Sequence, residues 1–361
     1  MPAFVKVESP KSAPMKWLYA SSGDGRFPDN TMERQSVSER LSMDNKLVFN
    51  KPWILQRADP YIYRHTDGTY YFTASVPEYD RIILRRADSL AGLADAQEHV
   101  LWRAHEKGPM SKHIWAPELH RVFGKWYLYY AGGEIDHPWK IRPYVLECQG
   151  EDPVHDPWIE KGKMKAHKDD PFSFRAFSLD GTVFQCNGQF YYVWAEKVGV
   201  GKQISNLYIA RMKNGYTLDT VQVLLTTPDY DWERYGFWVN EGPAVIKRNG
   251  KIYLTYSASD TGINYCMGML TADEDADLLD PLSWKKERWP VLKTDWEKEV
   301  YGPGHNSFTK DELGNDVLVF HARTEAEIEG NPLYNPNRHT MLQPLRWTDE
   351  KPIFSFDNDT F

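Results

Sequence analysis

Short runs of alternating apolar and polar residues dominate the chain after Asn45. Five of these runs begin just after a glycine in a turn-like segment, and the glycines are Gly68, Gly124, Gly188, Gly250 and Gly314. The runs cover residues 70–74, 126–131, 189–194, 251–256 and 316–320. Turn residues followed by alternation indicate a hairpin that enters a β-strand. Because helical periodicity is almost absent, the pattern predicts an all-β fold.

The turn glycines recur at a nearly constant period, with 56 to 64 residues from one to the next. Further strand-like runs follow several hairpins, at residues 82–86, 144–147, 207–212 and 265–270. A fixed period of this kind is typical of repeat architectures. In a β-propeller, radial repetition leaves only short, protected sheet edges. We therefore predict a five-bladed β-propeller over residues 45–361. A pair of β-sandwiches is the alternative, but it does not explain the period.

Residues 1–44 contain Ser, Pro, Lys, Arg and Asp without a sustained period. We expect a partly ordered N-terminal extension here, or a strap packed along the body through Trp17, Leu18 and Tyr19. No basic patch with an apolar run typical of a signal peptide is visible, and no run is long enough to span a bilayer. A cytoplasmic location is the expectation, and secretion stays open if the start is incomplete.

The net charge of −8 argues against nucleic acid or an anionic membrane as a partner, since both favour a basic surface. Aromatic residues make up 14% of the chain, which suits packed strands as well as stacking on a flat ligand. Cys148, Cys186 and Cys266 form neither a zinc motif nor a disulfide framework. No organic cofactor is expected.

One position in each repeat carries candidate chemistry. Eight or nine residues before the successive turn glycines stand Asp59, Trp115, Asp180, Glu241 and His305. The first strand of each propeller blade lines the central channel, so these side chains are expected to converge at one mouth. Buried carboxylates are costly, and three together raise the pKa of at least one. The arrangement favours acid/base catalysis over the alternative, in which the acids bind a cation or a neighbouring backbone.

The sequences around these five positions resemble glycoside hydrolase family 43. They are Arg-Ala-Asp-Pro at 57–60, His-Ile-Trp-Ala-Pro-Glu at 113–118, Ser-Leu-Asp-Gly at 178–181, Asn-Glu-Gly-Pro at 240–243 and Gly-His-Asn-Ser at 304–307. The resemblance runs from about Asn45 to the C-terminus. It implies a five-bladed propeller with inverting α-L-arabinofuranosidase, arabinanase or β-xylosidase activity.

By this resemblance, Asp59 is the general base that activates water and Glu241 is the general acid that protonates the leaving oxygen. Asp180 orients Glu241 and keeps its pKa high. An inverting site holds a water between sugar and base, so its two working carboxyls stand roughly 6.5–9.5 Å apart. Positions on blades one and four could have that separation.

Four further residues are weaker candidates. Arg338 resembles the family arginine that binds sugar hydroxyls, or it pairs with Asp59 or Asp180. Trp115 stacks on the sugar or plugs the channel, and Trp53 lies close enough in sequence to line the pocket. His305 resembles the family's axial histidine, which implies a hydrated calcium ion. The alternative is a histidine hydrogen-bonded to Asp180 or Glu241 without a metal.

The expected substrate is a terminal α-L-arabinofuranosyl residue of arabinan or an arabinoxylan-type oligosaccharide. Residues 113–118 and 302–307 look most like the arabinofuranosidase branch, and the polar segment 325–339 could close one end of a cleft, which favours exo attack. The alternatives are a β-xylosidase, a non-catalytic carbohydrate-binding propeller and a protein-interaction propeller.

Overall fold

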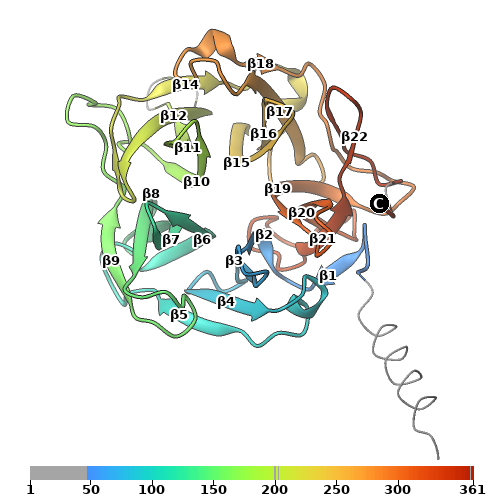
Figure 1. The fold of residues 1–361 in the computed structure, drawn as a ribbon, viewed down its shortest axis with the longest axis horizontal. Coiled ribbons are helices and arrows are strands. Elements are labelled where there is room, and N and C mark those ends of the chain that lie inside the picture. The colour runs from blue at the N-terminus through green and yellow to red at the C-terminus, as the bar shows by residue number, and fades with distance from the viewer. Residues whose placement is uncertain (1–46, 199–200, 202, 358) are drawn as a thin grey trace, which may run out of the picture. The chain divides into compact units, whose positions relative to one another are not determined.

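The computed structural model describes residues 47–361, apart from 199–200, 202 and 358. The extension predicted for residues 1–44 lies outside the described residues. Residues 47–361 form one compact unit in which antiparallel sheets are arranged around a central axis (Figure 1). The described residues make five blades, which confirms the predicted five-bladed β-propeller.

Each blade is a sheet of four main strands that runs outward from the axis. Blade 1 is β2 (Ala58–Arg64), β3 (Tyr70–Ser75), β4 (Arg81–Ala87) and β5 (His99–Arg103). Blade 2 is β6 (Lys112–Val122), β7 (Lys125–Glu134), β8 (His137–Cys148) and β9 (Trp158–Lys163). Blade 3 is β10 (Ser178–Cys186), β11 (Gln189–Lys197), β12 (Ile204–Asn214) and β14 (Val223–Thr226). Blade 4 is β15 (Trp238–Arg248), β16 (Lys251–Ala258), β17 (Cys266–Asp273) and β18 (Lys285–Lys286).

Blade 5 combines strands from both ends of the described chain. It contains β19 (Tyr301–Lys310), β20 (Asp316–Arg323), β21 (His339–Pro344) and β1 (Pro52–Ile54). In the antiparallel pairing of β1 with β21, Pro52 is opposite Met341 and Ile54 is opposite Thr340. The N-terminal strand therefore closes the ring as the outermost strand of the last blade.

The remaining described elements are short. β13 (Thr217–Leu218) pairs with β12, and β22 (Arg346–Trp347) pairs with β23 (Pro352–Ile353). Single 3₁₀ turns lie at Ala91–Leu93, Asp231–Glu233 and Pro281–Ser283. A short parallel pairing of β12 with β15 joins blades 3 and 4 into one continuous sheet.

The core consists of apolar clusters between neighbouring blades rather than one central core. Large aromatic side chains fill them, such as Trp126 between blades 1 and 2, Trp194 between blades 2 and 3, and Phe72 between blades 5 and 1. Full burial of one such side chain contributes about 1.5–3 kcal/mol. Most of the aromatic residues thus pack the blades together, and the axis is left for polar side chains.

Candidate active site

A β-bulge interrupts the first strand of every blade at the position that the sequence singled out. The pairing register shifts beside Asp59, Trp115, Asp180, Glu241 and His305. Asp59, Asp180 and His305 themselves have positive φ angles of 52°, 54° and 45°. Bulges re-aim side chains at active sites, and positive φ in residues other than glycine stores backbone strain there. The bulges turn these side chains toward the axis.

Hydrogen bonds from the preceding blade hold four of these bulges. In each case the residue with positive φ donates its backbone N–H to a side chain. Asp59 donates to His321 Nδ1 (3.0 Å), Ala116 to Ser75 Oγ (2.8 Å), Gly242 to Asp180 Oδ2 (3.1 Å) and His305 to Ser257 Oγ (2.6 Å). Each candidate position is therefore anchored to the blade before it, so the blades must be in place for the site to form.

Three of the accepting side chains, Ser75, Ser257 and His321, occupy the same position in the repeat. None of the three was among the residues predicted from the sequence. The seventh residue after each turn glycine is Ser75, Ala131, Ala195, Ser257 or His321, and each pairs with the first strand beside its bulge. Where this residue is Ala195, in blade 3, the carboxylate of Asp180 takes the backbone N–H of Gly242 instead. A polar residue at this register is the signal that would have identified Ser75, Ser257 and His321.

Asp59, Asp180 and His305 form the centre of the site. His305 Nδ1 lies 3.3 Å from Asp59 Oδ1 and 3.9 Å from Asp180 Oδ2, and all three residues are buried. Ser75 Oγ donates to the other oxygen of Asp59 (2.6 Å). The charges of the three carboxylates outweigh burial and raise the pKa of His305. The acids of blades 1 and 3 therefore favour the protonated form of the imidazole that lies between them.

The environments of the three acids separate their pKa values. Burial raises the pKa of Asp59, but the charges of His305 and Arg338, with a smaller contribution from His321, outweigh it and hold this pKa well below its usual range. Burial is also the main reason that the pKa values of Asp180 and Glu241 are raised, with neighbouring carboxylates adding to the effect. One ionised carboxyl thus faces two that retain protons more readily, which is what acid/base chemistry requires.

Tyr265, directly before β17, holds the side chain of Glu241. Its hydroxyl donates to Glu241 Oε1 (2.8 Å), and its ring stacks on His321 with centroids 5.6 Å apart and planes 6° apart. The close approach requires glycine at position 304, because a Cβ there would lie 2.5 Å from the Tyr265 ring. Tyr265 therefore contacts both Glu241 and His321, the histidine beside Asp59.

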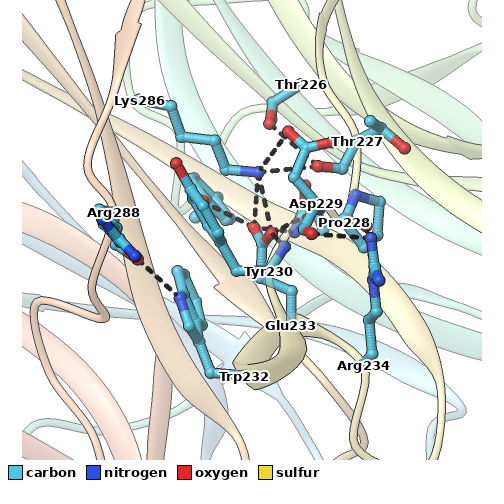
Figure 2. Close-up of polar contacts among 12 residues, drawn as sticks. Thr226, Thr227, Pro228, Asp229, Tyr230, Trp232, Glu233, Arg234, Lys286 and Arg288 are labelled. Atoms are coloured by element: carbon cyan, nitrogen blue, oxygen red, sulfur yellow. Dashed lines mark hydrogen bonds and ion pairs between the residues drawn. The ribbon is translucent and has the colours of Figure 1, made fainter.

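A buried ion pair in blade 4 supports the strand that carries Glu241 (Figure 2). Glu233 is fully buried and its Oε1 accepts from Asn240 Nδ2 (2.9 Å), the residue before Glu241. Lys286 Nζ lies 2.8 Å from Glu233 Oε1 and also donates to the carbonyl oxygen of Thr227 (2.7 Å). These contacts join Lys286 in β18 to Asn240 in β15 through Glu233, so the network fixes the start of β15.

Arg338 and Trp115 both lie at this end of the channel. Arg338 is buried, its Nη1 lies 3.5 Å from Asp59 Oδ1, and its Nη2 donates to Tyr79 Oη (2.7 Å). The expected pairing of Arg338 with Asp59 is therefore present. Trp115 stacks on His113 at 4.5 Å and meets Tyr79 edge-on at 5.7 Å. The segment 325–339 is the loop between β20 and β21 together with the first residue of β21, and it reaches blade 2, where Tyr334 Oη lies 3.1 Å from His113 Nε2.

Trp53 does not join this group, so its expected place in the pocket is wrong. It lies in β1, the outermost strand of blade 5, and packs on Phe72 in the cluster between blades 5 and 1. Trp53 and Asp59 are only six positions apart in the sequence. Over that distance, however, the chain crosses from the outermost strand of blade 5 to the inner strand of blade 1.

An aromatic groove of about 480 Å³ lies on the blade 2–4 side, lined by Trp139, Phe177, Lys197 and Phe237 among others. Trp139 and Phe237 are exposed, and the ring of Trp139 is 6.3 Å from that of Trp115. Lys197 is close enough to Glu241 for its charge to lower the pKa of that carboxyl. Exposed aromatic faces beside buried acids suit the stacking of a sugar ring.

The metal expected at His305 has few ligands available. Within residues 47–361 as described, no group of three or more His, Cys, Asp or Glu side chains is placed to hold a metal ion. His305 Nδ1 faces two carboxylates, so only its other ring nitrogen is left. Calcium prefers six to eight oxygen ligands, and these residues do not form such a cage.

No helix among the described residues is long and apolar enough to cross a membrane.

Comparison with known proteins identifies a single family. The family model for glycosyl hydrolases family 43 matches residues 49–352. The extracellular exo-α-(1→5)-L-arabinofuranosidase of Streptomyces avermitilis is 48% identical over 310 residues, which cover 85% of this chain and 63% of that protein. An enzyme of the same name from Streptomyces chartreusis is 50% identical over 285 residues, covering 79% of this chain and 85% of that protein. This chain thus spans less than two thirds of the Streptomyces avermitilis relative.

Among solved structures, the crystal structure of an α-L-arabinofuranosidase from Lactobacillus brevis is similar along nearly its whole length. The two share 50% sequence identity and a TM-score of 0.80, and the match covers 86% of this chain and 96% of the other. A thermostable family-43 glycoside hydrolase has the same fold at 23% identity and a TM-score of 0.68.

Proposed function

Because this chain belongs to glycosyl hydrolases family 43, we propose that it is an inverting α-L-arabinofuranosidase that releases terminal arabinofuranosyl residues from arabinan or arabinoxylan-type oligosaccharides. The observation that carries the proposal is the group of three acids around His305, in which the pKa of Asp59 is lowered and the pKa values of Asp180 and Glu241 are raised. A non-catalytic sugar-binding propeller would have no need for this costly arrangement.

Asp59 has the properties of the general base. A base must be ionised to accept a proton from water, and the charges of His305 and Arg338 keep Asp59 in that form. The hydrogen bond from Ser75 occupies Oδ2, and His305 and Arg338 lie beside Oδ1. These contacts fix the direction in which the carboxylate presents its free lone pairs.

Glu241 has the properties of the general acid. Burial raises its pKa, which favours the protonated form that a general acid needs, and its side chain is only partly buried, so it remains accessible to the leaving oxygen. Asp180 supports Glu241 through the backbone of the next residue, Gly242. Its carboxylate accepts the N–H of Gly242 and so fixes the bulge on which Glu241 is mounted. In this role Asp180 is a positioning residue.

The relatives support arabinose as the sugar and indicate where the enzyme acts. Three similar proteins at 48–50% identity are named α-L-arabinofuranosidases, which favours this activity over β-xylosidase. Two of them are described by name as extracellular, which favours an extracellular location over the cytoplasmic one expected from the first residues. A carbohydrate is the partner that this family implies.

The calcium ion expected at His305 stays a prediction, and no step of the proposed reaction involves it. Since residues 47–361, as far as the structure describes them, offer no cage of oxygen ligands there, an ion would be held mainly by water. The melting temperature in the presence of calcium or of a chelator tests this. Equal values would reject the ion.

The function is tested by hydrolysis of 4-nitrophenyl α-L-arabinofuranoside and 4-nitrophenyl β-D-xyloside, measured side by side. We expect the arabinoside to have the higher kcat/KM, because buried polar groups matched to one sugar are left unpaired by the other. Proton NMR of the first product formed should show inversion at the anomeric carbon. A higher kcat/KM on the xyloside would reject the sugar assignment, and retention would reject the mechanism.

A further inference from the structure

Four cationic side chains gather around a cavity of about 540 Å³ beside blade 2. Lys140 and Arg142 come from β8, Lys163 ends β9, and Arg175 lies in the segment that leads to β10. Glu134 is the one acidic residue among those that line the cavity. In a chain with a net charge of −8, such a group of like charges is unexpected.

The positive charges of this group are only partly neutralised. Lys140 pairs with Glu134 (2.8 Å), and Arg142 donates to the carbonyl oxygens of Ile141 and Arg175. In the part of the chain that the structure describes, the side chains of Lys163 and Arg175 have no ion pair. Burial lowers the pKa of Lys163 and the charges of Arg142 and Arg175 lower it further, while the charge of Glu196 opposes the shift only in part. A bound anion would relieve this repulsion.

The basic cavity adjoins the aromatic groove of the candidate active site. Trp139 and Ala176 line the groove, and their chain neighbours Lys140 and Arg175 line the cavity. The groove in turn leads to Glu241 through Lys197. A sugar chain with its arabinofuranosyl end at the acids could therefore continue along the groove to the cations.

We propose that this cavity binds the carboxylate of a hexuronate residue in the polysaccharide that carries the arabinofuranosyl unit. Uronates supply the carboxylate charge of such polymers, and arginine binds carboxylates through paired N–H donors. Pro109, Met110 and Phe174 give the cavity an apolar wall for the sugar ring. The proposal rests on the proposed function, because it extends the same substrate beyond the reacting sugar.

The test is native affinity electrophoresis in gels that contain polygalacturonate, with its methyl-esterified form as the neutral comparison. The variant is Lys163→Gln with Arg175→Gln, and neither residue belongs to the acid/base group. The matched control is Lys285→Gln with Arg103→Gln, which makes the same change in net charge at two exposed positions in β18 and β5. We expect polygalacturonate to retard the wild type and the control, and the esterified polymer not to.

For the cavity variant we expect a roughly two- to thirtyfold loss of affinity for polygalacturonate, since each exposed ion pair contributes only modestly. Equal retardation of the cavity variant and the control would overturn the proposal, as would equal retardation by the esterified polymer or none of the wild type. A parallel gel with glucuronoxylan tells whether galacturonate or glucuronate is preferred. The cavity variant should hydrolyse neutral linear arabinan at the same rate as the wild type. If the wild type does not hydrolyse this polymer, the proposed function is rejected, but the binding result still stands.

Discussion

Tyr265→Phe tests whether the Tyr265 hydroxyl tunes Glu241. The hydroxyl donates to Glu241 Oε1 at 2.8 Å and lowers the pKa of that carboxyl. A hydrogen bond to a charged group contributes about 1.5–3 kcal/mol, and one to a neutral group about 0.5–1.5 kcal/mol. The difference, roughly 1–1.5 kcal/mol, favours the ionised form. Because 1.36 kcal/mol corresponds to one pKa unit, removing the hydroxyl should raise the pKa of Glu241 by about one unit.

The assay is the pH dependence of kcat/KM on 4-nitrophenyl α-L-arabinofuranoside. A general acid works in its protonated form, so activity falls as pH rises through the pKa of Glu241. The alkaline limb should therefore move up by about one unit in Tyr265→Phe. Tyr253→Phe is the matched control. Tyr253 lies in the same blade, and its hydroxyl donates to the carbonyl oxygen of Glu350 instead of to Glu241. An alkaline limb that stays in place or moves down in a folded Tyr265→Phe would refute the reasoning.

Three further predictions follow from the same contacts. Glu241→Ala should keep more activity on an aryl arabinoside with a good leaving group than on arabinobiose, whereas Asp59→Ala should lose both, and equal losses for Glu241→Ala would contradict its role. Lys286→Met leaves the buried carboxylate of Glu233 without its cation, so urea denaturation should show a loss of about 3–5 kcal/mol in the free energy of unfolding, of which Glu233→Gln in the same chain should recover part. Burial lowers the pKa of His321 from 6.5 to about 3. Its contribution to stability is therefore complete above pH 6.5 and is lost as the pH falls toward 3. Melting temperatures of His321→Gln should depend less on pH over that window than those of the wild type.

The sequence predicted the blades because their signals are local. A turn glycine followed by alternation needs only a few residues to be recognised, and β3, β7, β11, β16 and β20 all begin within a few residues of such a glycine. The candidate acids were found because the repeat places them at one register. Nothing local shows that Asp59, Asp180 and His305 have positive φ, since glycine usually occupies such positions.

Contacts between blades were harder to predict than contacts within them. Tyr265 begins one of the recurring strand-like runs, but nothing in that run shows that its ring packs against Gly304, some 40 residues later, or that its hydroxyl reaches Glu241. Trp53 was misplaced because closeness in sequence does not carry across the ring closure. The resemblance to a known family implied roles for the acids, but it did not reveal the side chains that hold them.

The closure of the ring through β1 sets the order in which the site can be assembled. Asp59 lies near the start of the described chain, but three of its partners, His305, His321 and Arg338, belong to the last blade. Contacts across such long stretches of sequence form slowly, and on a growing chain they must wait for the final strands. Asp59, the proposed general base, should thus be the last member of the site to acquire its environment. Any condition that separates β1 from β21 should release it first and stop the reaction while the other four blades are still folded.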